Sequence, residues 1–193
     1  MRWARPVLKR FLGRRNGHDK AAHALYLTAV EQARQPHFYA ALGVPDSLDG
    51  RFEMIVLHVY LILRSLRRHD DPAADIGQRL FDVMFADMDR SLREMGVADI
   101  SVGKRIKQMA KAFYGRVAAY DAALSAPSTA LEQALRRNAY GTAVPADGQV
   151  TTLADYLRGQ AADLAEIPGE RLLRGDFRFA DRFGEATGKG IDR

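Results

Sequence analysis

The chain of 193 residues has no cysteine and a formal net charge of +5 at pH 7. Its length fits one domain with a sizeable core, and the lack of cysteine excludes disulfides, thiolate nucleophiles and cysteine-based metal sites. Six cations precede the first acid, Asp19, so the remainder is close to neutral and a uniformly basic nucleic-acid binder is not indicated. The composition, rich in alanine, leucine and arginine, favours helices.

The basic start of the chain also carries apolar residues on one helical face. It lacks the apolar core of a secretory signal. Such an acid-free amphipathic segment is typical of a surface that touches anionic lipid or RNA, and it resembles a mitochondrial presequence; a frayed solubilising tail is the alternative. We expect residues 1–19 to be a flexible arm that becomes helical at a membrane, through Arg2, Trp3, Arg5, Lys9, Arg10, Phe11, Arg14 and Arg15.

Two helices are predicted before the most apolar part of the chain. The first runs from about Lys20 to Arg34 and ends before Pro36. The second, in "HFYAALG", is short and ends at Gly43, a residue suited to the left-handed conformation found after helices. In the following "PDSLDG", either aspartate can cap the next helix.

The next helix contains ten residues, Met54 to Leu63, that are apolar except for one histidine. A bilayer span needs about 20 residues, and arginines flank this run. Its apolar side chains, including Val59, cover most of the circumference, which predicts a central core helix. His58 has no histidine or carboxylate one turn away, so we expect a structural histidine rather than a ligand or a proton carrier.

Two long amphipathic helices follow, from about Ala73 to Met95 and from Ser101 to Leu124. Acid-first pairs at i,i+4 occur in the first of them. The aspartates of "DMD" diverge around the helix, so a solvated face is favoured over a metal site. The inner faces are rich in methionine, which suits varied apolar clients but also an ordinary core. The candidate client-binding residues are Met84, Met88, Met95, Met109 and Phe113.

The second of these helices also has a basic face. It could bind RNA, lipid or an acidic partner, or it could be only the solvated side of a core helix. The residues of this face are Lys104, Lys107, Lys111 and Arg116.

Two more helices complete the predicted fold, one with capping-box spacing between Thr129 and Glu132 and one that ends before Pro168. We therefore expect an all-α protein with one compact helical domain of six to seven helices over residues 20–167. Residues 168–193 are predicted to be a partly disordered extension because they end in a glycine-rich stretch.

Known catalytic motifs are missing from the sequence. There is no Walker loop, GxGxxG, HExxH or GxSxG, and the five histidines are dispersed. Nothing assembles a nucleophile, a base and an orienting group. We therefore expect a protein that is not an enzyme and has no catalytic residue, metal or cofactor.

Two longer stretches, "GVPDSLDGRFEM…LH" and "DMDRSLREMGV", are more specific than the periodicity. Together with their spacing they resemble the ubiquinol–cytochrome c chaperone family, strongly from about Ala21 to Leu124 and more weakly toward Ile167. The short length is similar to that of bacterial members of the family.

This resemblance implies an all-helical assembly factor for respiratory complex III that binds newly made cytochrome b or its assembly intermediate. It further implies a ribosome or a small helical protein as a partner, and no DNA. We expect the chain at the inner face of the bacterial cytoplasmic membrane, in peripheral contact with anionic lipid, or alternatively in the mitochondrial matrix.

Two other functions stay open at this point. An RNA- or ribosome-binding helical protein would use the lysines of the basic face as phosphate contacts, with a steep dependence on salt. A helical enzyme acting on a lipid would use Asp82, Asp87 or Asp89 with a divalent metal.

Overall fold

The computed structural model describes residues 4–69, 71–126, 129–141 and 143–183, and the side chains of 16–69, 72–126, 129–141 and 143–183. Within these ranges the chain forms eight helices and no strand, which confirms the all-α prediction. The helices are α1 (Ala4–Ala33), α2 (Pro36–Ala40), α3 (Leu48–Leu66), α4 (Asp71–Glu94), α5 (Asp99–Leu124), α6 (Thr129–Asn138), α7 (Asp147–Glu166) and α8 (Gly169–Leu173).

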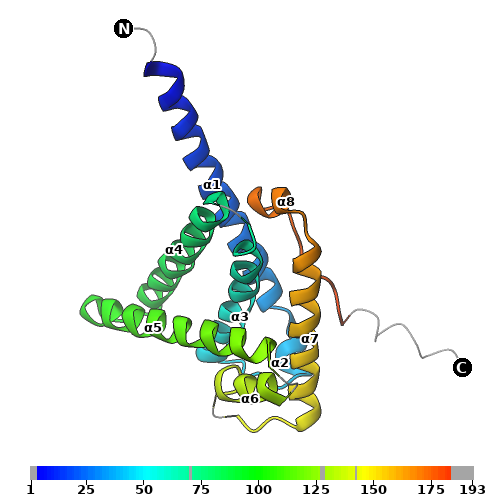
Figure 1. The fold of residues 1–193 in the computed structure, drawn as a ribbon. Helices are drawn as coiled ribbons and strands as arrows, with labels where there is room; N and C mark the ends of the chain where they lie inside the picture. Colours follow the sequence, from blue (N-terminus) through cyan, green and yellow to red (C-terminus); the bar gives the residue numbers. More distant parts are fainter. Residues whose placement is uncertain (1–3, 70, 127–128, 142, 184–193) are drawn as a thin grey trace, which may run out of the picture.

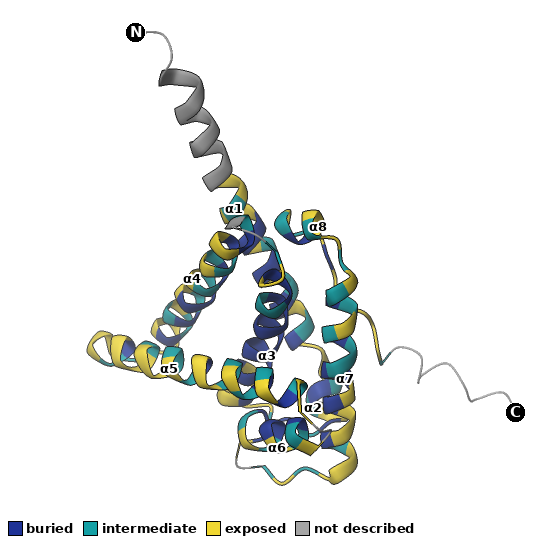
Figure 2. Ribbon diagram, viewed as in Figure 1, coloured by how far each residue is buried: buried dark blue, intermediate teal, exposed yellow. Residues whose placement is uncertain are grey.

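Helix α3 is the centre of the fold. Helices α1, α4, α5 and α7 all pack against it, and Figure 1 shows α3, α4 and α5 as three sides of a triangle with α7 beyond α3. In Figure 2 the ribbon of α3 is the most continuously buried of the long helices. Val59 is fully buried, as predicted, whereas Leu63 is only partly buried.

The start of α3 differs from the prediction. Ser47, and not an aspartate, is the N-cap, because its hydroxyl accepts a hydrogen bond from the backbone N–H of Gly50 at 3.2 Å. Asp46 instead accepts from Arg51 at 2.6 Å. Glycine is required at position 50, since a Cβ there would lie 2.0 Å from the carbonyl oxygen of Pro45.

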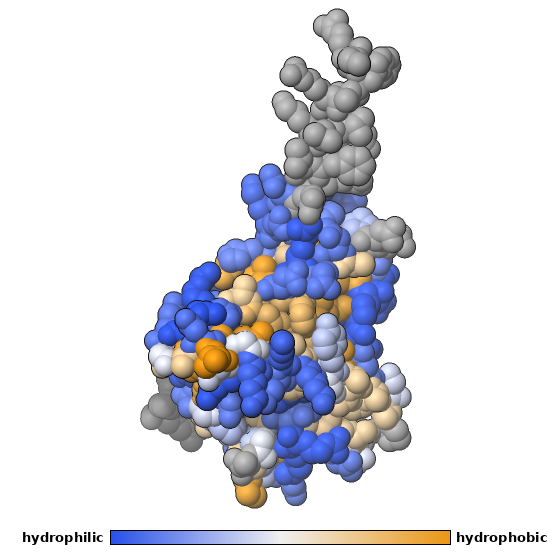
Figure 3. All heavy atoms as spheres, turned by 90° about the vertical axis from the view of Figure 1, so that its left-hand side faces the viewer, coloured by the Kyte–Doolittle hydropathy of each residue, from blue (hydrophilic) through white to orange (hydrophobic). Residues whose placement is uncertain are grey.

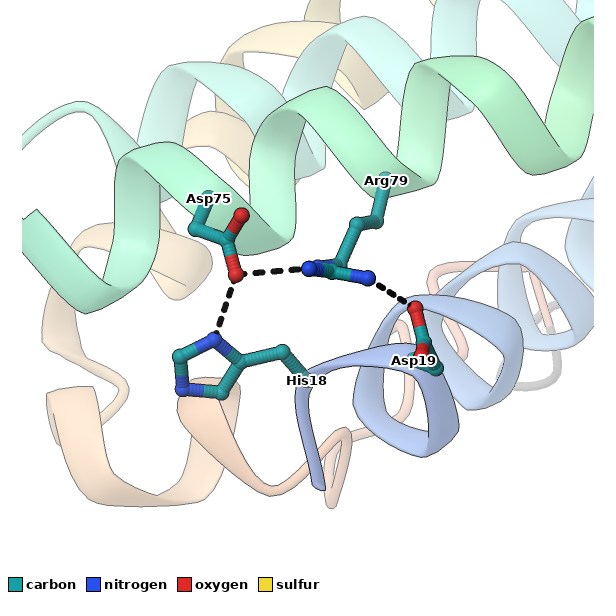
Figure 4. A network of polar contacts seen from close by, with 4 residues as sticks. All are labelled: His18, Asp19, Asp75 and Arg79. Atoms are coloured by element: carbon teal, nitrogen blue, oxygen red, sulfur yellow. Dashed lines mark hydrogen bonds and ion pairs between the residues drawn. The ribbon is translucent and has the colours of Figure 1, made fainter. Parts of the chain in front are cut away.

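Helix α1 is joined to α4 by a network of polar side chains, drawn in Figure 4. His18 Nδ1 lies 2.6 Å from Asp75, and Arg79 donates to Asp75 at 2.9 Å while also pairing with Asp19. The Asp75–Arg79 pair confirms the i,i+4 prediction. Because these ion pairs are largely exposed, they contribute little to the stability of the fold. Their main effect is to fix how α1 and α4 are aligned along each other.

The chain from Pro168 onward returns to the core. Phe177 and Phe179 are buried, and the ring of Phe183 stacks on that of His37 with centroids 3.9 Å apart. Gln160 anchors the segment, because its amide donates to the carbonyl of Ala180 at 2.6 Å and accepts from the N–H of the same residue at 3.2 Å. The compact domain therefore continues through residue 183, beyond the expected end near 167.

The first helix is longer than the sequence pattern predicts. Helix α1 begins at Ala4 instead of about Lys20, and Pro6 stands in its first turn, where proline is tolerated. The side chains of residues 1–15 lie outside the described residues, and the flexibility and lipid contact of the arm stay predictions. None of the described helices is long and apolar enough to cross a bilayer.

Candidate client-binding site

Helices α4 and α5 form a hairpin whose two arms diverge from the connection between Glu94 and Asp99 (Figure 1). A hollow lies on either side of their contact. Figure 3 looks onto this hairpin and shows hydrophobic atoms gathered across the middle of the face, with hydrophilic atoms above and below. The predicted client-binding residues are all on this hairpin, with Met95 in the connection, so each hollow is a candidate for the site.

The first hollow, the methionine groove, has a volume of about 580 Å³ and lies between the start of α3, the end of α4, the first half of α5 and the end of α6. Met88, Met95 and Met109 all line it. Met95 is half exposed and so is Leu48 on the opposite side, so the groove has apolar side chains that solvent reaches. Such flexible, polarizable side chains can adapt to apolar segments of differing shape.

One wall of the methionine groove carries a buried ion pair. Glu53 of α3 is buried, and both its oxygens accept hydrogen bonds from the guanidinium of Arg116 on α5. Burial raises the pKa of Glu53, and the hydrogen bonds from Arg116 oppose that shift. Sequence reasoning missed this pair, although a glutamate beside an uninterrupted apolar run was a signal that a cation had to meet it.

The second hollow, the aromatic pocket, has a volume of about 490 Å³ and lies inside the triangle of α3, α4 and α5. Phe81, Phe113 and Tyr114 line it, together with Leu63 and other apolar residues of α3. The rings of Phe81 and Phe113 meet edge to face with centroids 5.5 Å apart. Tyr114 is exposed, so this pocket is also accessible at its edge.

The five predicted client-binding residues are thus separated by the structure. Three of them, Met88, Met95 and Met109, meet in the methionine groove. Phe113 is buried and lines the aromatic pocket. Met84 is fully buried in the core and cannot touch a client in this state of the protein. Periodicity placed all five on one inner face, but it could not show where the two helices diverge.

The four residues of the predicted basic face are also divided. Lys104, Lys107 and Lys111 are exposed on the outer side of α5. Arg116 is partly buried and engaged by Glu53, so its guanidinium serves the α3–α5 contact. A fourth exposed cation, Arg105, lies at the edge of the methionine groove.

The three aspartates of α4 considered for a metal site are engaged by neighbouring side chains. Asp87 accepts from the hydroxyl of Tyr26 on α1 at 2.7 Å, and Asp82 accepts from Gln78 at 2.9 Å. Asp89 is bound by Arg93, which lowers the pKa of Asp89 and confirms the second i,i+4 pair. Among the described residues no group of three or more histidine, cysteine or acidic side chains could hold a metal ion.

His58 has both ring nitrogens hydrogen-bonded inside the core. Its Nδ1–H donates to the carbonyl of Met54 at 2.7 Å, and Nε2 accepts from the hydroxyl of Tyr156 at 2.8 Å. Gln32 donates to the same hydroxyl at 3.0 Å. Burial lowers the pKa of His58 to about 4, so the ring is neutral at pH 7. These contacts favour the structural role expected for this histidine.

Comparisons with known proteins identify the family to which the chain belongs. A model of the family described as ubiquinol-cytochrome C chaperone matches residues 40–179. The crystal structure of the Cbp3 homolog from Brucella abortus superposes with a TM-score of 0.80 at 36% identity, over 91% of this chain and 97% of that one. The chain therefore belongs to the ubiquinol–cytochrome c chaperone family, as its sequence blocks indicated.

Curated relatives from animals are more distant. Ubiquinol-cytochrome-c reductase complex assembly factor 1 of Xenopus laevis is 24% identical over 153 residues, which are 79% of this chain and 76% of the frog protein. The mouse protein of the same name is 26% identical, again over 79% of this chain but only 52% of its own length. This chain thus spans about half of the mouse relative.

Proposed function

We propose that this protein is a non-enzymatic assembly factor for the ubiquinol–cytochrome c reductase complex, respiratory complex III. The observation that carries the proposal is the family match over residues 40–179, joined to relatives whose names state this role. The described structure supports a binding protein, because its hollows are lined by apolar side chains while Asp82, Asp87 and Asp89 of α4 have structural partners.

The proposed client is newly made cytochrome b or its assembly intermediate, and the proposed site is the methionine groove. A membrane protein that has not yet met its partners exposes apolar helix faces, which a flexible methionine surface can cover. Met95 and Leu48 already expose about half of their surface at the groove. Arg105 stands beside them and would meet a polar or acidic group at the edge of the client segment.

The proposed location is the inner face of the cytoplasmic membrane, with the basic arm as a peripheral contact. Cations attract anionic lipid, and apolar side chains between them add insertion at the interface. A ribosome or a small helical partner would approach the same surface. Location and partners rest on the family and on the charge of the arm.

A strain that lacks this chain tests the proposal. Assembled complex III, separated on native gels, should be lost while the other respiratory complexes persist, and the wild-type chain should restore it. A chain with Met95→Glu and Met109→Glu should restore less, since two carboxylates in the groove would oppose an apolar client. A matched chain with Leu27→Glu and Val144→Glu, two exposed apolar sites away from the groove, should restore it fully. Normal complex III in the deletion strain would refute the proposal.

A further inference from the structure

Exposed apolar side chains gather on the α4–α5 hairpin. Three of the six large hydrophobic residues that the described structure leaves exposed belong to this element, namely Met95, Ile100 and Tyr114. Ile100 is 92% exposed and opens α5 at the outer end of the hairpin. A single exposed aliphatic residue is common on protein surfaces, but Ile100 is distinguished by the lysines that share its side of α5.

Three lysines lie on the same side of α5 as Ile100. Residues 100, 104, 107, 111 and 114 are spaced by four, three, four and three, so they form one stripe along the helix. Lys104, Lys107 and Lys111 are exposed and form no ion pair within the described structure. The stripe points away from the core-facing side of α5, on which Phe113 is buried, and Figure 2 shows how much of this helix is exposed.

Acidic residues are scarce around this stripe. The sequence contains no aspartate or glutamate between Ile100 and Tyr120. Asp99, just before the stripe, is engaged by Arg93, and Asp121, just beyond it, is engaged by Arg67 at 2.8 Å. Glu94 is the exposed acid of the neighbouring helix end. The stripe therefore carries a local positive potential that the protein itself does not neutralise.

We propose that the α4–α5 hairpin is a lipid contact, with Ile100 inserted at the headgroup–acyl boundary of an anionic bilayer and the three lysines at lipid phosphates. Lysine is a compact, hydrated charge on a long apolar stem, which suits an interface where the stem is covered and the ammonium stays in water. An RNA surface would instead be expected to use the bidentate fork of arginine. Ile100 at the tip offers a base no ring to stack on, whereas it inserts readily among acyl chains, and the exposed ring of Tyr114 at the other end of the stripe suits the headgroup level of a bilayer.

This contact would place α5 between the bilayer and the methionine groove. Arg105 and Met109 line the groove from α5, and at about 100° per residue both lie on the side of the helix opposite the lysine stripe. The inference rests on the proposed work at a membrane face, but its test does not involve complex III, so the two can fail separately.

The absence of cysteine allows a single environment-sensitive fluorophore to be placed on the full-length chain. Nitrobenzoxadiazole would be attached at Ile100→Cys, or at Val144→Cys, a 97% exposed site in the α6–α7 connection. The probes are vesicles of phosphatidylcholine, with or without phosphatidylglycerol. With phosphatidylglycerol the label at position 100 should shift to the blue and become protected from an aqueous quencher. The label at position 144 should not change.

Charge reversal supplies the second part of the test. Lys104→Glu, Lys107→Glu and Lys111→Glu together should weaken binding to the anionic vesicles about tenfold or more. The matched control changes the same number of exposed cations elsewhere, by Arg34→Glu, Arg68→Glu and Arg178→Glu, and should weaken it less. A label at position 100 that stays in water on vesicle-bound protein would overturn the inference. Failure of the protein to bind vesicles, or a response of this label to transfer RNA alone, would overturn it equally.

Discussion

Arg116 of α5 neutralises the buried carboxylate of Glu53 on α3, and this pair forms part of the wall of the methionine groove. The pair joins the central helix to the helix that carries the lysine stripe, so it links the core to the proposed client and lipid surfaces. Glu53 is almost completely buried, whereas Arg116 is partly accessible from the groove. Removal of Arg116 alone and removal of both partners should therefore lower the free energy of unfolding by different amounts.

Arg116→Met should lower the free energy of unfolding by about 3 kcal/mol, because it leaves a buried carboxylate without a cation. Burial raises the pKa of Glu53 even with Arg116 present, and loss of the guanidinium should raise it further. A raised carboxyl pKa favours the folded state at low pH, so the deficit should shrink as the pH falls from 7.5 toward 5. Urea unfolding at several pH values measures this.

The control is the double variant Glu53→Met with Arg116→Met. Two apolar side chains of similar length should restore most of the stability, since replacing both members of a buried pair is often close to neutral. If the double variant is as unstable as Arg116→Met alone, the unpaired carboxylate is not the cause of the loss.

Val59→Asp should abolish folding. Val59 is fully buried on the central helix, and an unpaired buried charge costs several kcal/mol, comparable with the total stability of about 5–15 kcal/mol of a typical domain. Leu63→Asp should be milder, because Leu63 is partly buried and lines the aromatic pocket. Circular dichroism during heating distinguishes the two. A Val59→Asp protein that melts like wild type would contradict the assignment of this stripe to the core.

His58 should make the fold sensitive to acid. Its pKa is about 4 in the folded protein and 6.5 in a free side chain, so the unfolded chain takes up the proton first as the pH falls. The free energy of unfolding should therefore be unaffected above about pH 7 and decrease between pH 6.5 and 4, by up to about 3 kcal/mol. His58→Gln should be modestly less stable at pH 7.5, show a smaller decrease, and retain assembly activity. Loss of activity in a stable His58→Gln protein would indicate a functional histidine.

Removal of residues 1–16 should reduce binding to anionic vesicles and leave the melting temperature unchanged. The six cations of the arm contribute about 1 kcal/mol each near an anionic surface before screening, whereas the buried part of α1 begins only at Ala21. Flotation of full-length and truncated protein with the same vesicles measures the difference. Equal recovery of both would exclude the arm as a membrane contact.

Much of the fold follows from patterns along single helices. The apolar run of α3, the glycine after α2 and the acid-first pairs of α4 depend on neighbours within a few residues, and each was predictable. The N-cap at Ser47 was harder to assign, because three residues of "PDSLDG" can cap a helix and their geometry decides. The return of Phe177 and Phe179 to the core was missed because alternating aromatic and basic residues without helical period look like a loose tail.

The candidate site was predictable only in part. Periodicity identified the methionines of the α4–α5 hairpin, but it could not show which of them meet the core. Met95 and Met84 share a stripe, yet Met95 lies just past the end of α4 and is half exposed, whereas Met84 lies in the middle of α4 and is fully buried. The partner of Arg116 could not be found either, since Glu53 is 63 residues away in sequence and the crossing of α3 and α5 brings them together.

Site-specific photo-crosslinking in cells tests the central claim, that the methionine groove holds a complex III component during assembly. Benzoylphenylalanine would replace Met95, which lines the groove, or Val144, which is exposed elsewhere. After pulse labelling, newly made cytochrome b should be captured from position 95 and not from position 144, with a signal that decays as complex III matures. No adduct with cytochrome b at position 95, or equal adducts at both positions, would contradict the account.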